Sequence, residues 1–408
     1  MQTKITWALL GAGAALLVVL GTMTGFLLGA NHFPNLRVAP TPSPVAQIIP
    51  TPSPRAVVVP SPSPNPFASR FQELPIPKPG GTPYAIITAP DGAVWFTEAE
   101  CTSGIGRLDS AGAWQHWSIT GNCQSQPLAI TRGSDGNLWF ADVWSSYGRV
   151  SPAGDITRFP MPEPSYPTGI TTGPDGNLWL AVASPQGKPF IAKVGLDGTE
   201  LAEYQLSPGA GEPRGIVTGP DGAVWFTESA GIGRLTPSGI LNEYPLPEGN
   251  GSGGPYQLTV GPDKNIWFVE YMPEGDGRIG RMTPSGHLTE FATPGLGGLQ
   301  WITAGPDKAL WFTAAHSDAI GRISLTGVVT SYQLPSLRAQ PVGIMTGPDE
   351  TSGSQKPPAT PPARSASSGS QPDFSSTGWA FRRWRSSTRD CRGCCSSASS
   401  NRTSSTRS

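Results

Sequence analysis

The sequence predicts an all-β protein: a β-propeller of four-stranded blades, six complete and a seventh truncated, placed after an N-terminal transmembrane helix. Two observations predict the propeller. An element of the form G-P-D-G-x-apolar-W-F recurs about every 43 residues, a period typical of propeller blades. The 51 glycines and 45 prolines indicate many tight turns or disorder, and the turns within the repeats use Asp-Gly and Ser-Gly, which a helical repeat would lack. A third observation, the uncharged N-terminal segment, predicts the membrane helix.

Residues 1–30 are predicted to form a membrane anchor. The stretch from Ile5 to Ala30 carries no charged residue. A membrane-spanning helix needs about 20 apolar residues, whereas the apolar core of a signal peptide has roughly 7–15. Cleavage after Ala30 would place Leu28 where a small residue is preferred, which favours an uncleaved anchor. A cleaved signal peptide is the alternative. Lys4 on the short N-terminal side places that end in the cytoplasm and the rest of the chain outside.

Residues 31–68 are predicted to be a linker. They contain PTPSP twice and PSPSP once, and proline at this density favours extended polyproline II structure. At about 3.1 Å per residue, such a segment could hold a domain about 100 Å from the membrane. The expected location is therefore extracytoplasmic and membrane-anchored.

Residues 69–349 are predicted to form the propeller. In the first repeat, four short strands are expected at 84–88, 94–97, 105–108 and 114–119. The tryptophans of the W-F pairs are expected to pack between neighbouring blades, and the arginines of the I-G-R elements to form hydrogen bonds between blades. The repeat is marked by Asp91, Asp135, Asp175, Asp221, Asp263, Asp307 and Asp349, and its tryptophans are Trp95, Trp139, Trp179, Trp225, Trp267 and Trp311.

Residues 350–408 are predicted to be a disordered, low-complexity tail. The tail contains Cys391, Cys394 and Cys395 but no second pair of ligands at a spacing suited to a metal. Codons that encode DETSGSQK from Asp349 to Lys356 read as D-G-N-L-W-F-T-E when one G is restored. That reading is the missing repeat element, so we interpret the tail as a frameshift product.

Two sets of residues are expected on one face of the propeller, here called the inlet face. The first set is the variable residue x of the P-x-[GA]-I motif that starts each innermost strand, here called the inlet residue; the second is the acidic residue after W-F-T. The inlet residues are Tyr84, Leu128, Thr168, Arg214, Tyr256, Gln300 and Val342, and the acidic residues are Glu98, Asp142, Glu228 and Glu270. A face with carboxylates, an arginine and tyrosines could hold a ligand or a metal.

From these sets we take Tyr84, Arg214, Tyr256, Gln300, Glu98, Glu228 and Glu270 as candidate ligand-binding residues. The alternative is that the carboxylates pair with nearby backbone N–H groups or with the I-G-R arginines. Cys101 and Cys123 lie in loops of the same face and form a candidate disulfide in an oxidising compartment. The net charge of −1 and the 14% of charged residues give no electrostatic reason to expect nucleic acid.

The segments Gly219–Gly239 and Gly261–Gly286 resemble the streptogramin B (virginiamycin B) lyases, and the similarity runs from about Pro83 to Asp349. The resemblance implies a seven-bladed propeller that opens cyclic depsipeptide antibiotics by Mg²⁺-dependent elimination at the ester, with a histidine as general base. It also implies histidines at the inlet positions of the last two blades, and a metal-binding glutamate two residues before the second.

This sequence departs from that pattern. Gln300 and Val342 occupy the two histidine positions, and Gln340 occupies the glutamate position. Glutamine and valine cannot take up a proton near neutral pH. The histidines of the chain are elsewhere: His32, His116, His287 and His316.

We therefore expect a binding or scaffold module without a cofactor or metal site. Its expected partner is a small molecule, a peptide or a cell-surface glycan on the inlet face. The alternative is a streptogramin B lyase that uses Mg²⁺, with catalytic groups drawn from Glu228, Glu270, Arg214 and Tyr256.

Overall fold

A computed structural model describes residues 4–10, 14–20, 71–76, 82–99, 103–119, 125–162, 165–184, 188–247, 253–336, 338–347 and 378–381. The candidate disulfide of Cys101 and Cys123, the proline-rich linker and nearly all of the 350–408 tail lie outside these residues.

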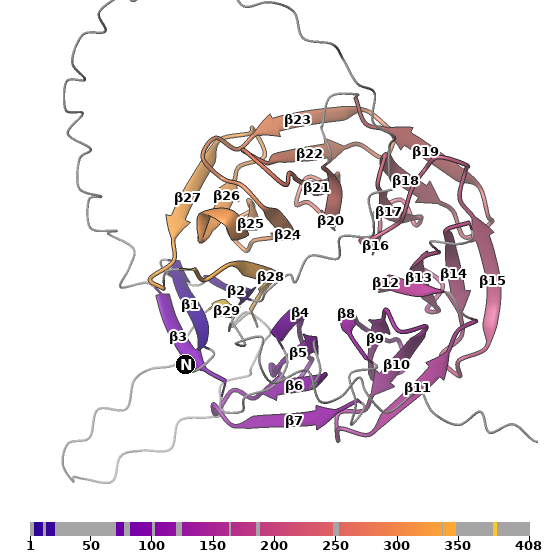
Figure 1. Ribbon diagram of the computed structural model, residues 1–408, viewed down its shortest axis with the longest axis horizontal. Coiled ribbons are helices and arrows are strands. Elements are labelled where there is room, and N and C mark those ends of the chain that lie inside the picture. Colours follow the sequence, from indigo (N-terminus) through magenta and orange to yellow (C-terminus); the bar gives the residue numbers. More distant parts are fainter. Residues whose placement is uncertain are drawn as a thin grey trace, which may run out of the picture.

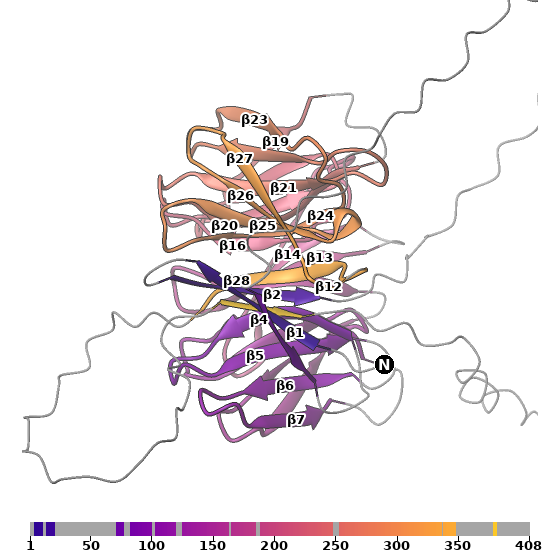
Figure 2. The ribbon, with the colours of Figure 1, turned by 90° about the vertical axis from the view of Figure 1, so that its left-hand side faces the viewer.

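Six four-stranded antiparallel sheets form the blades of a ring, which confirms the predicted propeller (Figure 1). Each blade runs outwards from its first strand; in Figure 2, the strands of blade one lie in this order from the middle of the ring. The strands of blades one to three are β4 (Thr82–Thr88), β5 (Val94–Ala99), β6 (Gly104–Leu108), β7 (Trp114–Ser118), β8 (Pro127–Arg132), β9 (Leu138–Asp142), β10 (Ser146–Val150), β11 (Ile156–Pro160), β12 (Tyr166–Thr172), β13 (Leu178–Ala183), β14 (Phe190–Val194) and β15 (Glu200–Gln205).

Blades four to six repeat the same arrangement. Their strands are β16 (Ile216–Thr218), β17 (Val224–Glu228), β18 (Gly231–Leu235), β19 (Leu241–Pro245), β20 (Gly254–Val260), β21 (Ile266–Tyr271), β22 (Arg278–Met282), β23 (Leu288–Ala292), β24 (Leu299–Ala304), β25 (Leu310–Ala314), β26 (Ala319–Ile323) and β27 (Val329–Gln333). A short 3-10 helix, η2 (Ala315–Ser317), follows β25.

The tryptophans of the W-F pairs pack between blades, as predicted. Trp225 of blade four is fully buried in a cluster with Ile266 and Phe268 of blade five. Its indole N–H donates a 3.0 Å hydrogen bond to Asp221 in the turn of its own blade. One residue therefore joins two blades through apolar contact and fixes the turn through a polar one, and truncating such a side chain costs roughly 3–5 kcal/mol.

The arginines of the I-G-R elements divide between two roles. Arg234 forms a 2.7 Å ion pair with Asp221 within its own blade. Arg149 donates to the carbonyl of Leu196 in the next blade, at 3.4 Å. The prediction of bonds between blades is thus correct for Arg149, whereas Arg234 stabilises its own turn.

Between blades six and one lies a seventh sheet of five strands, so the ring has six regular blades and not the seven that the resemblance implied. The sheet contains β28 (Pro341–Thr346), β2 (Ala14–Leu20), β29 (Gly378–Phe381), β1 (Lys4–Leu10) and β3 (Phe71–Pro75), in that order. A buried cluster nearby includes Trp311 of blade six and Phe96 of blade one together with Ile344 of β28. This cluster closes the ring.

The predicted helix over 5–30 differs from the structure, in which 4–10 and 14–20 are strands. β28 is followed by no further repeat, and its edge would otherwise present unpaired N–H and C=O groups. β2 pairs with this edge, with Leu17 opposite Met345. An uncharged segment rich in leucine and valine suits a strand in such a position. Among the described residues, no helix is long and apolar enough to cross a membrane.

Candidate functional site

In blades one, two, three, five and six, the inlet residue lies in a β-bulge at the start of the innermost strand, whereas Arg214 of blade four precedes β16. In blade one, Pro83 pairs with Glu98 and Ile86 with Phe96, which leaves Tyr84 outside the regular register. Register shifts of the same kind occur at the start of β8, β12, β20 and β24. A bulge bends its strand and redirects a side chain, which is why bulges are frequent beside binding sites.

The threonine of the W-F-T element, which blades one, four and six contain, accepts the backbone N–H of the residue after the inlet residue, a role that the sequence analysis missed. Thr227 Oγ1 accepts the N–H of Gly215, at 2.9 Å, and donates to the carbonyl of Tyr256 in the next blade, at 2.8 Å. Thr313 likewise accepts from Trp301 and donates to Val342. The recurrence of threonine after W-F was the signal in the sequence. The Thr227 and Thr313 side chains link the inlets of neighbouring blades.

Tyr84 and Tyr256 meet across the ring. Their hydroxyl oxygens lie 2.6 Å apart, although 172 residues separate them in the chain. Both side chains are buried, at 6% and 8% exposure. Burial, with a smaller contribution from Tyr256, raises the pKa of Tyr84 well above its usual value. Burial is also the main cause of the raised pKa of Tyr256. The pair therefore stays protonated at neutral pH and acts as a hydrogen-bond donor and acceptor.

Arg214 and Trp301 complete this group. The guanidinium carbon of Arg214 lies 5.3 Å from the ring centre of Tyr256, a cation–π distance. Trp301 packs edge-on against Tyr84, with ring centres 5.5 Å apart. Of the predicted ligand-binding residues, the structure thus brings together Tyr84, Tyr256 and Arg214. Trp301 was missed because the sequence analysis singled out its neighbour Gln300.

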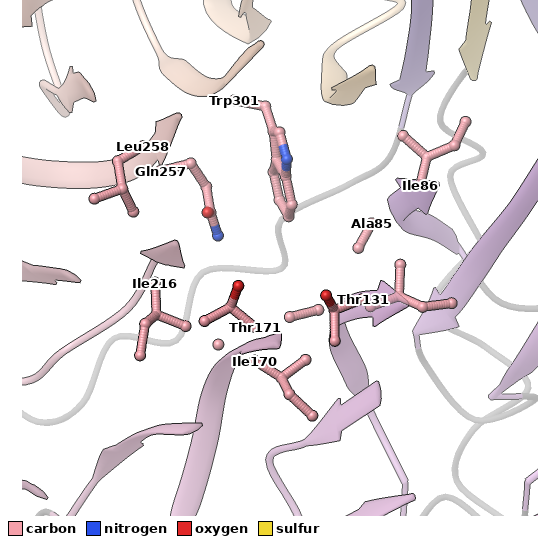
Figure 3. Close-up of a pocket in the computed structure, with 12 residues that line it drawn as sticks. Ala85, Ile86, Thr131, Ile170, Thr171, Ile216, Gln257, Leu258 and Trp301 are labelled. Atoms are coloured by element: carbon pink, nitrogen blue, oxygen red, sulfur yellow. The ribbon is translucent and has the colours of Figure 1, made fainter. Parts of the chain in front are cut away.

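A cavity of about 170 Å³ lies on the ring axis beside this group. Trp301 and Gln257 point into it from blades six and five, and Thr171 points into it from blade three (Figure 3). Much of the remaining lining is aliphatic, including Ile170 and Leu258. The cavity has room for one ring or short chain, since an engineered 150 Å³ cavity holds benzene.

The two positions that hold histidines in the related lyases are closed off here. Val342 is fully buried and packs with Tyr84 and Ala85. Gln300 is 4% exposed. Among the described residues, no three His, Cys, Asp or Glu side chains are grouped so that they could hold a metal ion. The residues present therefore do not fit the Mg²⁺ that the resemblance implied.

The predicted acidic residues are buried in their own blades. The Glu98 carboxylate lies 2.8 Å from His116 Nε2 on the outermost strand of blade one. Asp142 pairs with Arg158 of β11 at 3.0 Å and accepts the backbone N–H of Gln126 at 2.7 Å. The alternative interpretation was that these carboxylates pair with backbone N–H groups or with the I-G-R arginines. The contacts of Glu98 and Asp142 are of this kind, except that the side-chain partners lie on the outermost strand.

In blades four and five, the same positions bring two carboxyl groups together. Burial, followed by the charge and hydrogen bond of Glu243, raises the pKa of Glu228 to about 8. Burial, followed by Glu290, raises the pKa of Glu270 to about 7. The exposed fractions of Glu228 and Glu270 are 2% and 0%. Each pair can share a proton at neutral pH, because two adjacent carboxylates, one of them buried, cannot both be ionised cheaply.

His316 lies beside the aromatic group that contains Tyr84, Tyr256 and Trp301. His316 in η2 is exposed, and its Nε2 lies 3.5 Å from the hydroxyl of Tyr271. Tyr271 in turn lies against Tyr256, with ring centres 6.1 Å apart. Contacts between rings thus connect the tyrosine pair to a titratable side chain at the rim.

The ring of four-stranded W-F blades places the protein among the β-propellers, and the sequence comparison gives the family. The chain belongs to the virginiamycin B lyase family, whose sequence pattern matches residues 69–248 and, in a second overlapping match, residues 165–352. Among curated proteins, none matches the chain.

Solved structures agree with this assignment. A streptogramin B lyase is 35% identical with a TM-score of 0.59, covering 66% of this chain and 89% of that one. A catalytically inactive histidine-to-alanine variant of virginiamycin B lyase from Staphylococcus aureus, with quinupristin, is 33% identical with a TM-score of 0.61, covering 67% and 91%. A periplasmic gluconolactonase of Pseudomonas aeruginosa shares the fold alone, at 15% identity, with a TM-score of 0.53 over 66% and 89%.

Proposed function

We propose that this protein is a membrane-tethered, extracytoplasmic binding module that holds a small ligand on its inlet face without cleaving it. One observation carries the proposal: Tyr84, Tyr256 and Arg214 converge from three blades, while the family's histidine positions hold Gln300 and Val342. A hydrogen-bonding pair, a cation and an adjoining cavity provide for binding. None of these groups provides a base.

The absence of a base at these positions opposes elimination. Removal of a proton needs a group whose pKa lies near the working pH and which can reach the substrate. The Staphylococcus aureus enzyme is described as catalytically inactive when one histidine becomes alanine. Glutamine and valine are as incapable of proton transfer as alanine. A shared fold does not carry the reaction with it.

A streptogramin B lyase is the second candidate function. The pKa of Glu270, raised to about 7 mainly by burial, would suit a general base. Its carboxyl is fully buried beside Glu290, however, so a substrate would have to enter the blade to reach it. His316 is exposed and would serve better. We rank binding first because neither group lies within the Tyr84–Tyr256 site.

We further propose that residues 5–30 cross the membrane in the cell. The support is the uncharged stretch itself, which is longer than the about 20 residues that a spanning helix needs. The strands β1 and β2 are a competing place for the same residues. A residue can occupy only one of these two placements at a time.

Protease treatment of intact cells distinguishes the two placements. Cleavage in the proline-rich linker should release a soluble propeller fragment if the segment is an anchor. If residues 4–20 remain bound to the soluble propeller fragment after the linker has been cut, they belong to the sheet beside β28. The anchor proposal is then wrong. Complete protection would reverse the proposed topology.

Ligand binding is tested by a fragment screen on the full-length protein, observed by saturation-transfer NMR. Small aromatic acids, amides, sugars and N-acetyl amino acids are suitable probes. Tyr256→Phe and Trp301→Leu should lose most of the hits. Tyr204→Phe changes an outer-strand tyrosine that stacks on Trp179, and it should keep them. Hits that survive both inlet-face variants would contradict the proposed site.

A further inference from the structure

The inlet of blade four places a positive charge beside the tyrosine pair. Arg214 is half-buried, and among the ion pairs of the described residues none involves it. By contrast, Arg107, Arg234 and Arg322 each have a carboxylate within 3 Å. Arg214 contacts an aromatic face instead. Its positive charge is therefore left for another partner.

The backbone holds this arginine in a fixed place. Its N–H donates to the carbonyl of Thr227 at 3.0 Å, and the next N–H, of Gly215, donates to the hydroxyl of the same threonine. A Cβ on Gly215 would lie 2.9 Å from the carbonyl oxygen of Tyr256 and 2.8 Å from Gln257. Glycine is needed there for the inlets of blades four and five to approach, so the arginine and the tyrosine are set side by side.

The tyrosine pair has one hydroxyl proton to spare. Two hydroxyl groups carry two protons, and the 2.6 Å bond between Tyr84 and Tyr256 uses one. The other can be donated to a ligand. Burial raises the pKa of both hydroxyls, and the positive charge of Arg214 acts on both in the opposite direction. The surroundings thus offer a cation and an O–H donor together.

We propose that the ligand of the inlet face carries an anionic oxygen group, a carboxylate or a phosphate, which Arg214 pairs with while the tyrosine pair donates a hydrogen bond. The guanidinium has N–H donors that match both groups. The apolar part of such a ligand is held in the adjoining cavity beside Trp301 and Gln257. This inference rests on the proposed binding function and names the chemistry of its ligand.

Three matched probes test it on the full-length protein by ligand-observed NMR titration: phenylacetate, phenyl phosphate and phenylacetamide. The ring suits a cavity of this size, and the amide is the uncharged control. At least one anion should bind about tenfold more tightly than the amide, a difference of about 1.4 kcal/mol. Whichever anion is preferred identifies carboxylate or phosphate as the head group. Arg214→Gln should reduce the preference to less than about twofold, and Arg214→Lys should retain part of it. Lys308→Gln, in a turn at the opposite ends of the strands, should leave it unchanged.

Equal binding of anion and amide by the unmodified protein, or a preference that survives Arg214→Gln, would overturn the anionic ligand. So would failure of both anions to bind. The binding function itself is judged separately. If Tyr256→Phe and Trp301→Leu weaken the amide and the anions alike, the inlet face is a binding site whose ligand is uncharged.

Discussion

The carboxylate of Glu98 lies 2.8 Å from Nε2 of His116, two strands further out in the same blade. Each acidic residue after a W-F pair faces the outermost strand in this way, but the partner differs from blade to blade. The pairs are Glu98 with His116, Asp142 with Arg158, Glu228 with Glu243, and Glu270 with Glu290. The repeat therefore contains its own comparison: the same geometry has a basic partner in two blades and an acidic partner in two others.

The like-charge pair of blade four predicts a pH-dependent stability. Burial and Glu243 raise the pKa of Glu228 from 4.5 to about 8 in the folded state. The folded state thus binds the proton more tightly than the unfolded chain. The stability that this provides is complete below about pH 4.5 and is lost as the pH rises through 8. Glu228→Gln should remove this loss and stabilise the protein at pH 9 by roughly 1 to 3 kcal/mol.

Urea denaturation at pH 5 and pH 9 measures this effect. Glu200→Gln, on the exposed edge of β15, is the control and should follow the unmodified protein at both pH values. If Glu228→Gln shows the same loss of stability between pH 5 and pH 9 as the unmodified protein, the carboxyl pair does not share a proton.

The pair of Glu98 with the basic side chain of His116 in blade one predicts a different result. His116→Leu leaves the buried carboxylate of Glu98 without its partner and should lower the free energy of unfolding by about 1–3 kcal/mol. His116→Arg reproduces the Asp142–Arg158 pair of blade two and should retain most of the stability. Equal destabilisation by leucine and arginine would show that only the packing of the imidazole matters.

The threonine that joins two inlets predicts coupled effects on stability and binding. Thr227→Val preserves shape but leaves the N–H of Gly215 and the carbonyl of Tyr256 each without a bond. We expect a loss of about 1–3 kcal/mol in unfolding free energy, with weaker binding of the NMR probes because Tyr256 shifts. Thr330→Val, on exposed β27, is the control. Unchanged probe affinity in Thr227→Val would show that the threonine has no positioning role.

The fold could be predicted because its determinants are local and repeated. Each W-F pair, Asp-Gly turn and I-G-R element recurs within one blade, and burial of Trp225 between blades follows from the period alone. The sheet between blades six and one could not be predicted in this way. It joins segments as distant as 14–20 and 341–346, and no repeat relates them.

The site was predictable only in part. The P-x-[GA]-I motif indicated Tyr84, Arg214 and Tyr256, and the structure groups them. Which residues meet across the ring depends on blade number and bulge geometry, and sequence spacing specifies neither. The repeat pattern places Glu98 and Glu270 at equivalent positions of their blades but does not specify what each carboxylate faces. Their partners lie 18 and 20 residues further on, at His116 and Glu290.

Restoration of the reading frame after Pro348 should stabilise the ring. The element D-G-N-L-W-F-T-E supplies a tryptophan and second strand for β28, and truncating one such tryptophan costs roughly 3–5 kcal/mol. For a domain of this size we expect the melting temperature to rise by at least about 5 °C. The repaired strand would also compete with β2 for the edge of β28. If the original and repaired proteins melt together, residues 350–408 are a genuine part of the protein and not a frameshift product.

The central claim is that this member of the virginiamycin B lyase family binds without cleaving. The most direct measurement is the rate of quinupristin ring opening, followed by mass spectrometry, with full-length protein and excess Mg²⁺. A streptogramin B lyase run in parallel is the positive control. We predict no product above the rate without protein, for the unmodified chain as for Gln300→Ala. Ring opening at an enzyme-like rate that Tyr256→Phe or His316→Ala abolishes would contradict the claim and establish the protein as a lyase with a relocated base.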